Sequence, residues 1–79
     1  MRLSELGVGA VARVVRVDPG AAGGGRRLVE IGFVPGTEVV VERRAPLGDP
    51  TVYQIRSTRL ALRRVAADLV EVTLENAPA

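Results

Sequence analysis

Residues 38–63 read EVVVERRAPLGDPTVYQIRSTRLALR, and this stretch decides the fold because it holds three strand patterns in succession. Apolar and polar residues alternate over 38–44, again over 51–56 and again over 59–63. Alternation with a period of two predicts strands that bury one face and expose the other. The prolines and the glycine of 45–50 predict a wide loop between the first two strands.

The flanking sequence adds two more strands and one helix. Residues 10–17 alternate as a strand whose phase slips, which predicts a bulge near Val15. Residues 69–74 predict the closing strand. Three consecutive glycines disfavour a long helix, so we expect only about two helical turns over 25–31. One further helical turn is expected over 65–68.

Glycines mark the end of the expected helix and the turn that follows it. Gly32 is a left-handed cap in this interpretation, and the next residue, Phe33, would then contact Leu28. Pro35 and Gly36 occupy the two central positions of a type II turn, where proline fixes φ and glycine accepts a positive φ.

The composition favours the same architecture. Valine supplies 14 of the 79 residues, and β-branched side chains pack well on a pleated sheet. Nine glycines and five prolines are typical of a chain with frequent turns. We therefore expect an all-β fold with one short helix, built as a small five-stranded barrel that forms a single domain over residues 1–79.

Charge and missing residue types exclude several function classes. All 11 basic residues are arginine, 9 residues are acidic, and the formal net charge is +2. The chain has no cysteine and no histidine, which excludes disulfides, zinc fingers and histidine-based catalysis. No apolar run is long enough to cross a membrane and no signal pattern opens the chain, so we expect a cytoplasmic protein that does not insert into membranes.

Neither catalysis nor a resident cofactor is expected. No nucleophile stands in a pattern with a base, and the glycine-rich stretches 7–12 and 20–27 lack the strand and helix context of nucleotide loops. Glu38 and Glu42 share a strand face, but they lie roughly 13 Å apart and cannot chelate one ion together. Each is better explained as a solvated residue opposite an arginine, so no metal ligands are assigned.

Nucleic acid is also not expected as a partner. Arginine pairs at 26–27, 43–44 and 63–64 could contact phosphates, but the net field is weak and acidic residues are interspersed. Only Tyr53 and Phe33 could stack on bases. A small-barrel RNA-binding protein therefore stays as an alternative only.

A protein partner is the remaining possibility. The 45–50 loop would project a leucine between two stiff prolines, although a wide hairpin turn explains this loop equally well. An exposed apolar residue beside arginines is a plausible interface anchor. The candidate partner-binding residues are Pro46, Leu47 and Pro50 in the loop, with Arg43, Arg44 and Tyr53 as flanking contacts.

The segment RLVEIGFVPGTEV at 27–39, the loop APLGDP at 45–50 and RLALR at 59–63 together resemble the FeoA family. The resemblance covers about residues 3–74. Three positions depart from the usual pattern: Ile31 replaces a frequent Met as a volume-conserving core exchange, Ser57 stands where Gly is usual, and Val65 replaces an acidic residue.

The resemblance implies an SH3-like barrel and a small cytosolic accessory protein of ferrous iron uptake. Such a protein would bind the cytoplasmic GTP-binding region of the FeoB permease. Similar domains form the C-terminal module of iron-dependent repressors, so a role as a transition-metal-responsive regulatory module is the first alternative.

Overall fold

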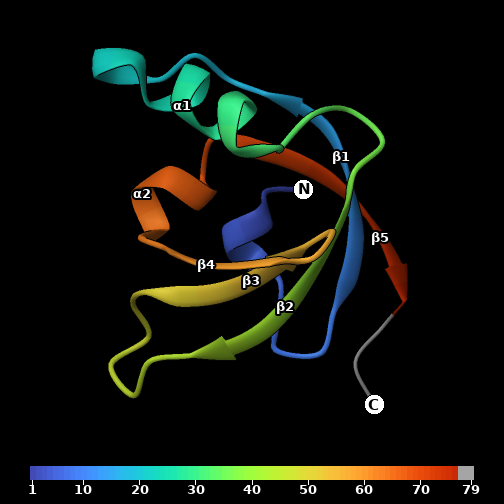
Figure 1. Ribbon diagram of the computed structural model, residues 1–79. Coiled ribbons are helices and arrows are strands. Elements are labelled where there is room, and N and C mark those ends of the chain that lie inside the picture. Colours follow the sequence, from blue (N-terminus) through green and yellow to red (C-terminus); the bar gives the residue numbers. More distant parts are fainter. Residues whose placement is uncertain (77–79) are drawn as a thin grey trace.

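Five antiparallel strands form one curved sheet in the computed structural model, which describes residues 1–76 (Figure 1). The strand order across the sheet is β4-β3-β2-β1-β5. The strands are β1 (Val11–Val17), β2 (Glu38–Arg44), β3 (Thr51–Ile55), β4 (Thr58–Leu62) and β5 (Val70–Asn76). The predicted all-β, five-stranded architecture is confirmed, with strand ends within two residues of those expected.

The inner face of the sheet is apolar because every second strand residue points to it. Val39 and Val41 of β2 are almost completely buried, while Glu38, the first residue of the strand, is exposed. The same alternation buries Tyr53 and Ile55 of β3. Burying these side chains removes apolar surface from water at roughly 25 cal/mol per Å², and this supplies most of the driving force for folding.

A bulge in β1 restores the alternation that the sequence interrupts. Val14 pairs with Val72 and Arg16 pairs with Glu71, so Val15 is the extra residue on the bulged strand. Val15 is exposed as a result. The bulge predicted near this residue is confirmed, and its bend lets β1 pair with β2 on one side and β5 on the other.

The helix α1 (Gly24–Ile31) follows a short 3₁₀ turn, η2 (Ala21–Gly23), and agrees with the expected 25–31 to within one residue. Its start lies directly on the chain leaving β1. The Gly25 amide donates a 2.8 Å hydrogen bond to the carbonyl oxygen of Pro19, and a Cβ on Gly25 would lie only 2.0 Å from the carbonyl oxygen of Asp18. Only glycine allows this approach.

The helix ends as the glycines predict. Gly32 has a φ of +135°, and the Phe33 amide donates a 3.0 Å hydrogen bond to the Leu28 carbonyl. The Phe33 ring is completely buried in the core. Gly36 has a φ of +90° in the turn that leads into β2. The expectation that Ile31 belongs to the core was wrong: it is 43% exposed on the outer face of α1.

The first residues and the second helix close the open side of the sheet. Leu3 in the 3₁₀ helix η1 (Leu3–Glu5) and Leu6 after it are both buried in the core. η1 contacts both β5 and α2 (Arg64–Ala67), and the Val72 amide of β5 donates a 2.8 Å hydrogen bond to the Met1 carbonyl. Within residues 1–76, neither helix has the length or the apolar run needed to cross a lipid bilayer.

Candidate functional site

The loop of residues 45–50, between β2 and β3, protrudes from the lower left of the sheet in Figure 1. Hydrogen bonds hold its shape: the Ala45 amide donates to the Pro50 carbonyl at 3.0 Å, and the Gly48 amide donates to the Ala45 carbonyl at 2.8 Å. Asp49 ties the loop to α2, because its Oδ1 accepts a 3.0 Å hydrogen bond from the Arg64 amide. The loop is therefore a structured projection.

Leu47 stands at the tip of this projection with 97% of its surface exposed, the largest exposure of any large apolar residue among those described. It contributes almost nothing to the core, so folding does not account for an apolar side chain here. An apolar group that is held rigidly in water loses little conformational freedom when a partner buries it. The predicted projection of Leu47 is thus confirmed, while its contact with a partner stays a prediction.

A shallow groove of about 360 Å³ runs beside the tip. Apolar atoms predominate in its lining because the proline rings and Val52 of β3 lie along it, next to the stem of Arg43. The full lining consists of Arg43, Arg44, Ala45, Pro46, Pro50 and Val52. Arg43, Pro46 and Pro50 are exposed, as the sequence-based assignment of a binding surface requires.

Two of the six predicted contact residues have other roles. Tyr53 is only 1% exposed and belongs to the core, so it was wrongly predicted to flank the interface. Burial raises the pKa of its hydroxyl, although a hydrogen bond with Thr51 and the nearby Arg44 cation act in the opposite direction. Because Tyr53 alternates correctly as an inward strand residue, its burial follows from the same pattern that predicted the strand.

Arg44 is half-buried and points back into the domain. Its Nη2 donates a 2.8 Å hydrogen bond to the Leu6 carbonyl, and its Nε donates another of 2.8 Å to the Thr51 hydroxyl. The side chain therefore joins the N-terminal segment to the base of the loop. The expectation that Arg44 contacts a partner was wrong for its guanidinium group, which is already engaged within the fold.

Arg64 is a neighbour of the loop that the sequence did not predict. Its side chain lines a small hollow of about 10 Å³ together with Gly48 of the loop and Arg44. The residue is far from the loop in sequence and reaches it only because β4 and β3 pair, which places the start of α2 beside the end of the hairpin. The position of Arg64 beside the loop could have been predicted only from the pairing register of β3 and β4, because no local sequence motif indicates it.

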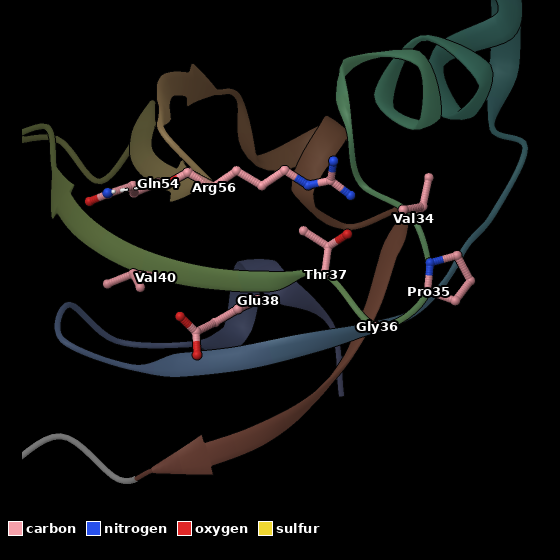
Figure 2. A pocket seen from close by; sticks show the side chains of 8 residues that line it. All are labelled: Val34, Pro35, Gly36, Thr37, Glu38, Val40, Gln54 and Arg56. Carbon is pink, nitrogen blue, oxygen red and sulfur yellow. Dashed lines mark hydrogen bonds between the residues drawn. The ribbon is translucent and has the colours of Figure 1, made fainter.

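Another hollow lies on the outer face of the sheet, at the turn that precedes β2 (Figure 2). Its volume is about 460 Å³, and the Arg56 side chain extends across it toward Val34 and Thr37. Glu38 is the only carboxylate in its lining, and no serine, cysteine or histidine lines it. The polar groups of this lining are the Thr37 hydroxyl, the Glu38 carboxylate, the Gln54 amide and the Arg56 guanidinium.

The carboxylates of the sheet pair with arginines. Glu42 accepts a 2.9 Å ion-paired hydrogen bond from Arg59, and Glu38 lies 3.9 Å from Arg13, as expected for solvated strand residues opposite arginines. No group of three carboxylates, histidines or cysteines within residues 1–76 is arranged to hold a metal ion.

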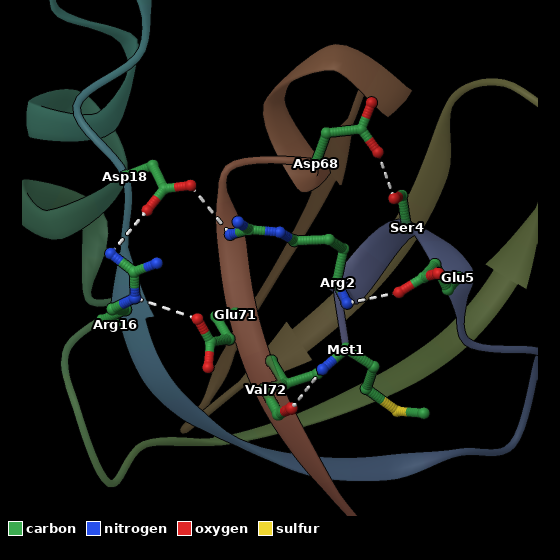
Figure 3. Close-up of polar contacts among 9 residues, drawn as sticks. All are labelled: Met1, Arg2, Ser4, Glu5, Arg16, Asp18, Asp68, Glu71 and Val72. Carbon is green, nitrogen blue, oxygen red and sulfur yellow. Dashed lines mark hydrogen bonds and ion pairs between the residues drawn. The ribbon is translucent and has the colours of Figure 1, made fainter.

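Five of the six ion pairs within residues 1–76 involve β1 or Asp18, which directly follows it, and Figure 3 shows those around Arg16 and Asp18. Asp18 forms ion pairs with both Arg2 and Arg16, at 2.9 Å and 3.0 Å, and Arg16 also pairs with Glu71 at 2.9 Å. The hydrogen bond to Glu71, followed by the charge of Asp18, raises the pKa of Arg16. Exposed pairs of this kind add little stability, but they cancel charge on this side of the molecule.

Comparison with known proteins gives a consistent result. The family model described as "FeoA domain" matches residues 1–74. A fusion protein from Porphyromonas gingivalis, named as Fe(2+) transport protein A joined to the Fe(2+) transporter FeoB, is 45% identical over 74 residues. That match covers 94% of this chain but only 9% of the relative, so the chain spans less than a tenth of the fusion protein.

Two solved structures share the fold over most of their length. A FeoA from Stenotrophomonas maltophilia, described as a procaryotic SH3 domain protein complexed with zinc, is 42% identical with a TM-score of 0.82, covering 92% of this chain and 89% of that one. A FeoA-like protein from Clostridium acetobutylicum reaches a TM-score of 0.90 at 28% identity, over 100% of this chain and 91% of the other. The implied SH3-like barrel is confirmed.

Proposed function

The chain belongs to the FeoA family, and we propose that it is a non-enzymatic accessory protein of ferrous iron uptake that binds the cytoplasmic GTP-binding region of a FeoB-type permease. In this proposal residues 1–79 act as one module and work in the cytoplasm, where that region of the permease lies. The chain itself supplies a contact surface and leaves transport and nucleotide chemistry to the permease.

The fusion relative supports the choice of partner. Its name places a transport protein A and a FeoB transporter in one polypeptide, and this chain is 45% identical to it over 74 residues. Covalent linkage raises the effective concentration of two modules for each other, which favours a contact that is weak between separate chains. We infer that this chain makes the corresponding contact with a separate permease.

The single observation that carries the proposal is Leu47, which is 97% exposed on a loop held by its own hydrogen bonds. Interfaces concentrate their binding energy in a few apolar or arginine anchors that a pocket on the partner buries. Pro46 and Pro50 limit the freedom of the chain on both sides of Leu47, so little entropy is lost on binding. These features support the loop as the surface that meets the permease.

The two alternatives from the sequence gain no support from the described residues. Phe33 and Tyr53 are the only aromatic residues of the chain, and both are buried, so neither can stack on an RNA base. Binding of RNA would have to rely on arginine–phosphate contacts alone. A metal-responsive role would need oxygen ligands that converge, whereas Glu38 and Glu42 are each paired with an arginine.

The test is a binding measurement with the purified cytoplasmic GTP-binding domain of the permease, in its GDP and GTP-analogue states. We expect Leu47→Ala to weaken binding by at least about tenfold while leaving the thermal midpoint unchanged. Val65→Ala is the matched control, because Val65 is also an exposed aliphatic residue, at 73%, but lies on α2 outside the loop. Undiminished binding by Leu47→Ala, or no binding by the unmodified chain in either state, would refute the proposal.

A further inference from the structure

The side chains of three arginines beside the 45–50 loop form no ion pairs with residues 1–76. Arg43 lines the groove beside the tip, and Arg64 lies against Gly48 on the other side. Neither forms an ion pair within 4 Å with any residue of 1–76. The guanidinium of Arg44 also has no ion pair, because it donates its hydrogen bonds to uncharged oxygens. Asp49 is the one carboxylate of the loop, and its Oδ1 accepts from the Arg64 backbone.

The side of the molecule formed by β1 and β5 differs, because its arginines are matched by carboxylates. Arg13 pairs with Glu75 at 2.6 Å, and Arg16 pairs with both Asp18 and Glu71. β1 and β5 lie on the right of Figure 1, away from the loop at the lower left. The loop end is therefore more positive than the side formed by β1 and β5, although Arg26 and Arg27 on α1 and Arg56 after β3 also form no ion pair within residues 1–76.

We propose that the surface recognised by the loop is an acidic protein face, in which carboxylates surround an apolar socket for Leu47. This inference rests on the proposed function and specifies the chemistry of the partner. Positive charge that flanks an apolar tip attracts a surface of opposite sign before contact, and it disfavours basic surfaces by like-charge repulsion. The uncompensated arginines thus select the partner and the orientation of docking.

The groove shows how the two kinds of contact combine. Its lining brings Arg43 together with Pro46, Pro50 and Val52. A partner segment in which apolar and acidic side chains alternate fits this groove. Its apolar side chains can pack against the prolines and Val52, and its acidic side chains can reach Arg43. An arginine can hold a carboxylate through two parallel hydrogen bonds, which gives such a contact directional specificity.

An anionic lipid surface offers the same charge but fits the apolar part less well. Leu47 is the only large apolar side chain exposed on the loop, and membrane binding at an interface scales with the apolar area that is buried. A single leucine therefore contributes more to binding a protein, where a preformed socket encloses it, than to binding a lipid bilayer. Vesicle binding is accordingly one arm of the test.

The test compares two variants that lose the same charge. Arg43→Gln with Arg64→Gln removes both uncompensated arginines at the loop and retains the Arg64 amide that bonds Asp49. Arg26→Gln with Arg27→Gln removes two exposed arginines from α1 and serves as the matched control. Association and dissociation rates with the permease's GTP-binding domain are measured at about 20 mM and about 200 mM NaCl, which differ severalfold in electrostatic screening.

For the unmodified chain and the α1 control, we expect the association rate to fall by about tenfold between the two salt concentrations. The loop variant should associate slowly at both, with little salt dependence. Leu47→Ala should instead raise the dissociation rate and keep the salt dependence. These outcomes separate steering by the arginines from anchoring by the leucine.

Binding that is indifferent to salt, or equally affected by both double variants, overturns the acidic-partner inference and leaves the proposed function standing. If the unmodified chain does not bind the permease domain even at low salt, both the acidic-partner inference and the proposed function are overturned. Sedimentation with vesicles of phosphatidylglycerol and phosphatidylcholine completes the test. If the chain binds these vesicles more tightly than the permease domain, and the loop variant abolishes that binding, the surface is a lipid-binding one and the inference is wrong.

Discussion

Replacing Arg44 with methionine should destabilise the fold, because this side chain bonds two otherwise poorly solvated oxygens. Its guanidinium donates 2.8 Å hydrogen bonds to the Leu6 carbonyl and to the Thr51 hydroxyl. Thr51 is only 5% exposed, and Leu6 is buried in the core. Methionine keeps most of the apolar stem of the side chain but can donate neither bond.

The magnitude follows from the two bonds. Hydrogen bonds from a charged donor contribute about 1.5–3 kcal/mol each. Water reaches part of this half-buried site and replaces some of that contribution, so we expect a net loss of about 2–4 kcal/mol. For a domain of this size each kcal/mol corresponds to about 4–8 °C in the thermal midpoint. The midpoint should therefore fall by roughly 10–30 °C.

Urea unfolding followed by circular dichroism measures this change, with the thermal midpoint as a second readout. Arg43→Met is the matched control, because Arg43 is the adjacent residue and its exposed side chain makes no ion pair or hydrogen bond among residues 1–76. The free energy of unfolding of this variant should differ from that of the unmodified chain by less than about 0.5 kcal/mol. A loss below about 1 kcal/mol for Arg44→Met, or equal losses for the two variants, would refute a structural role for Arg44.

Four further substitutions probe the core, two adjacent glycines and the buried tyrosine. Phe33→Ala should cost about 3–5 kcal/mol in urea unfolding, since the ring is fully buried; a loss under about 1 kcal/mol would place the ring outside the core. Gly25→Ala should destabilise by at least about 2 kcal/mol, because its Cβ would meet the Asp18 carbonyl oxygen at 2.0 Å. Gly24→Ala, whose Cβ would meet Leu69 at an ordinary 3.5 Å, should be neutral or slightly stabilising, and similar losses for the two would contradict this reasoning. Burial raises the pKa of Tyr53, so the folded chain holds the phenolic proton more tightly than the unfolded chain. The contribution of this hydroxyl to the free energy of unfolding should therefore be constant below about pH 10 and fall above it. Urea midpoints across that range should fall less steeply for Tyr53→Phe, and identical slopes would show that the hydroxyl does not titrate with unfolding.

The strands, the bulge and the end of the helix could be predicted because local rules decide them. Alternation fixes which face of β2 is buried, and the interrupted phase around Val15 requires one extra residue in any antiparallel pairing. Gly32 and Gly36 adopt the positive φ values that their neighbours in sequence suggested. In these places the information lies within a few residues of the feature it determines.

The errors concern residues whose role depends on distant partners. Arg44 has the composition of a surface residue, but its bonds run to Leu6, which is 38 positions away. Arg64 reaches the loop only through the pairing of β3 with β4. Ile31 is apolar on a helix only two turns long, where Leu28 alone is a large buried residue and no third element covers the opposite side. Periodicity within one segment carries no information on these tertiary contacts.

The pairing of β1 with β5 has a consequence for how the protein is made. Val17 pairs with Val70 and Val11 pairs with Asn76, so the longest ladder of the sheet joins the two ends of the chain. During synthesis the first strand has one free edge until the last strand leaves the ribosome, and contacts between such distant positions are slow to form. Cooperative closure of the core must then await the synthesis of β5. In a fused polypeptide such as the Porphyromonas gingivalis relative, this module could finish folding while the ribosome is still making the transporter, provided that the module comes first in the chain.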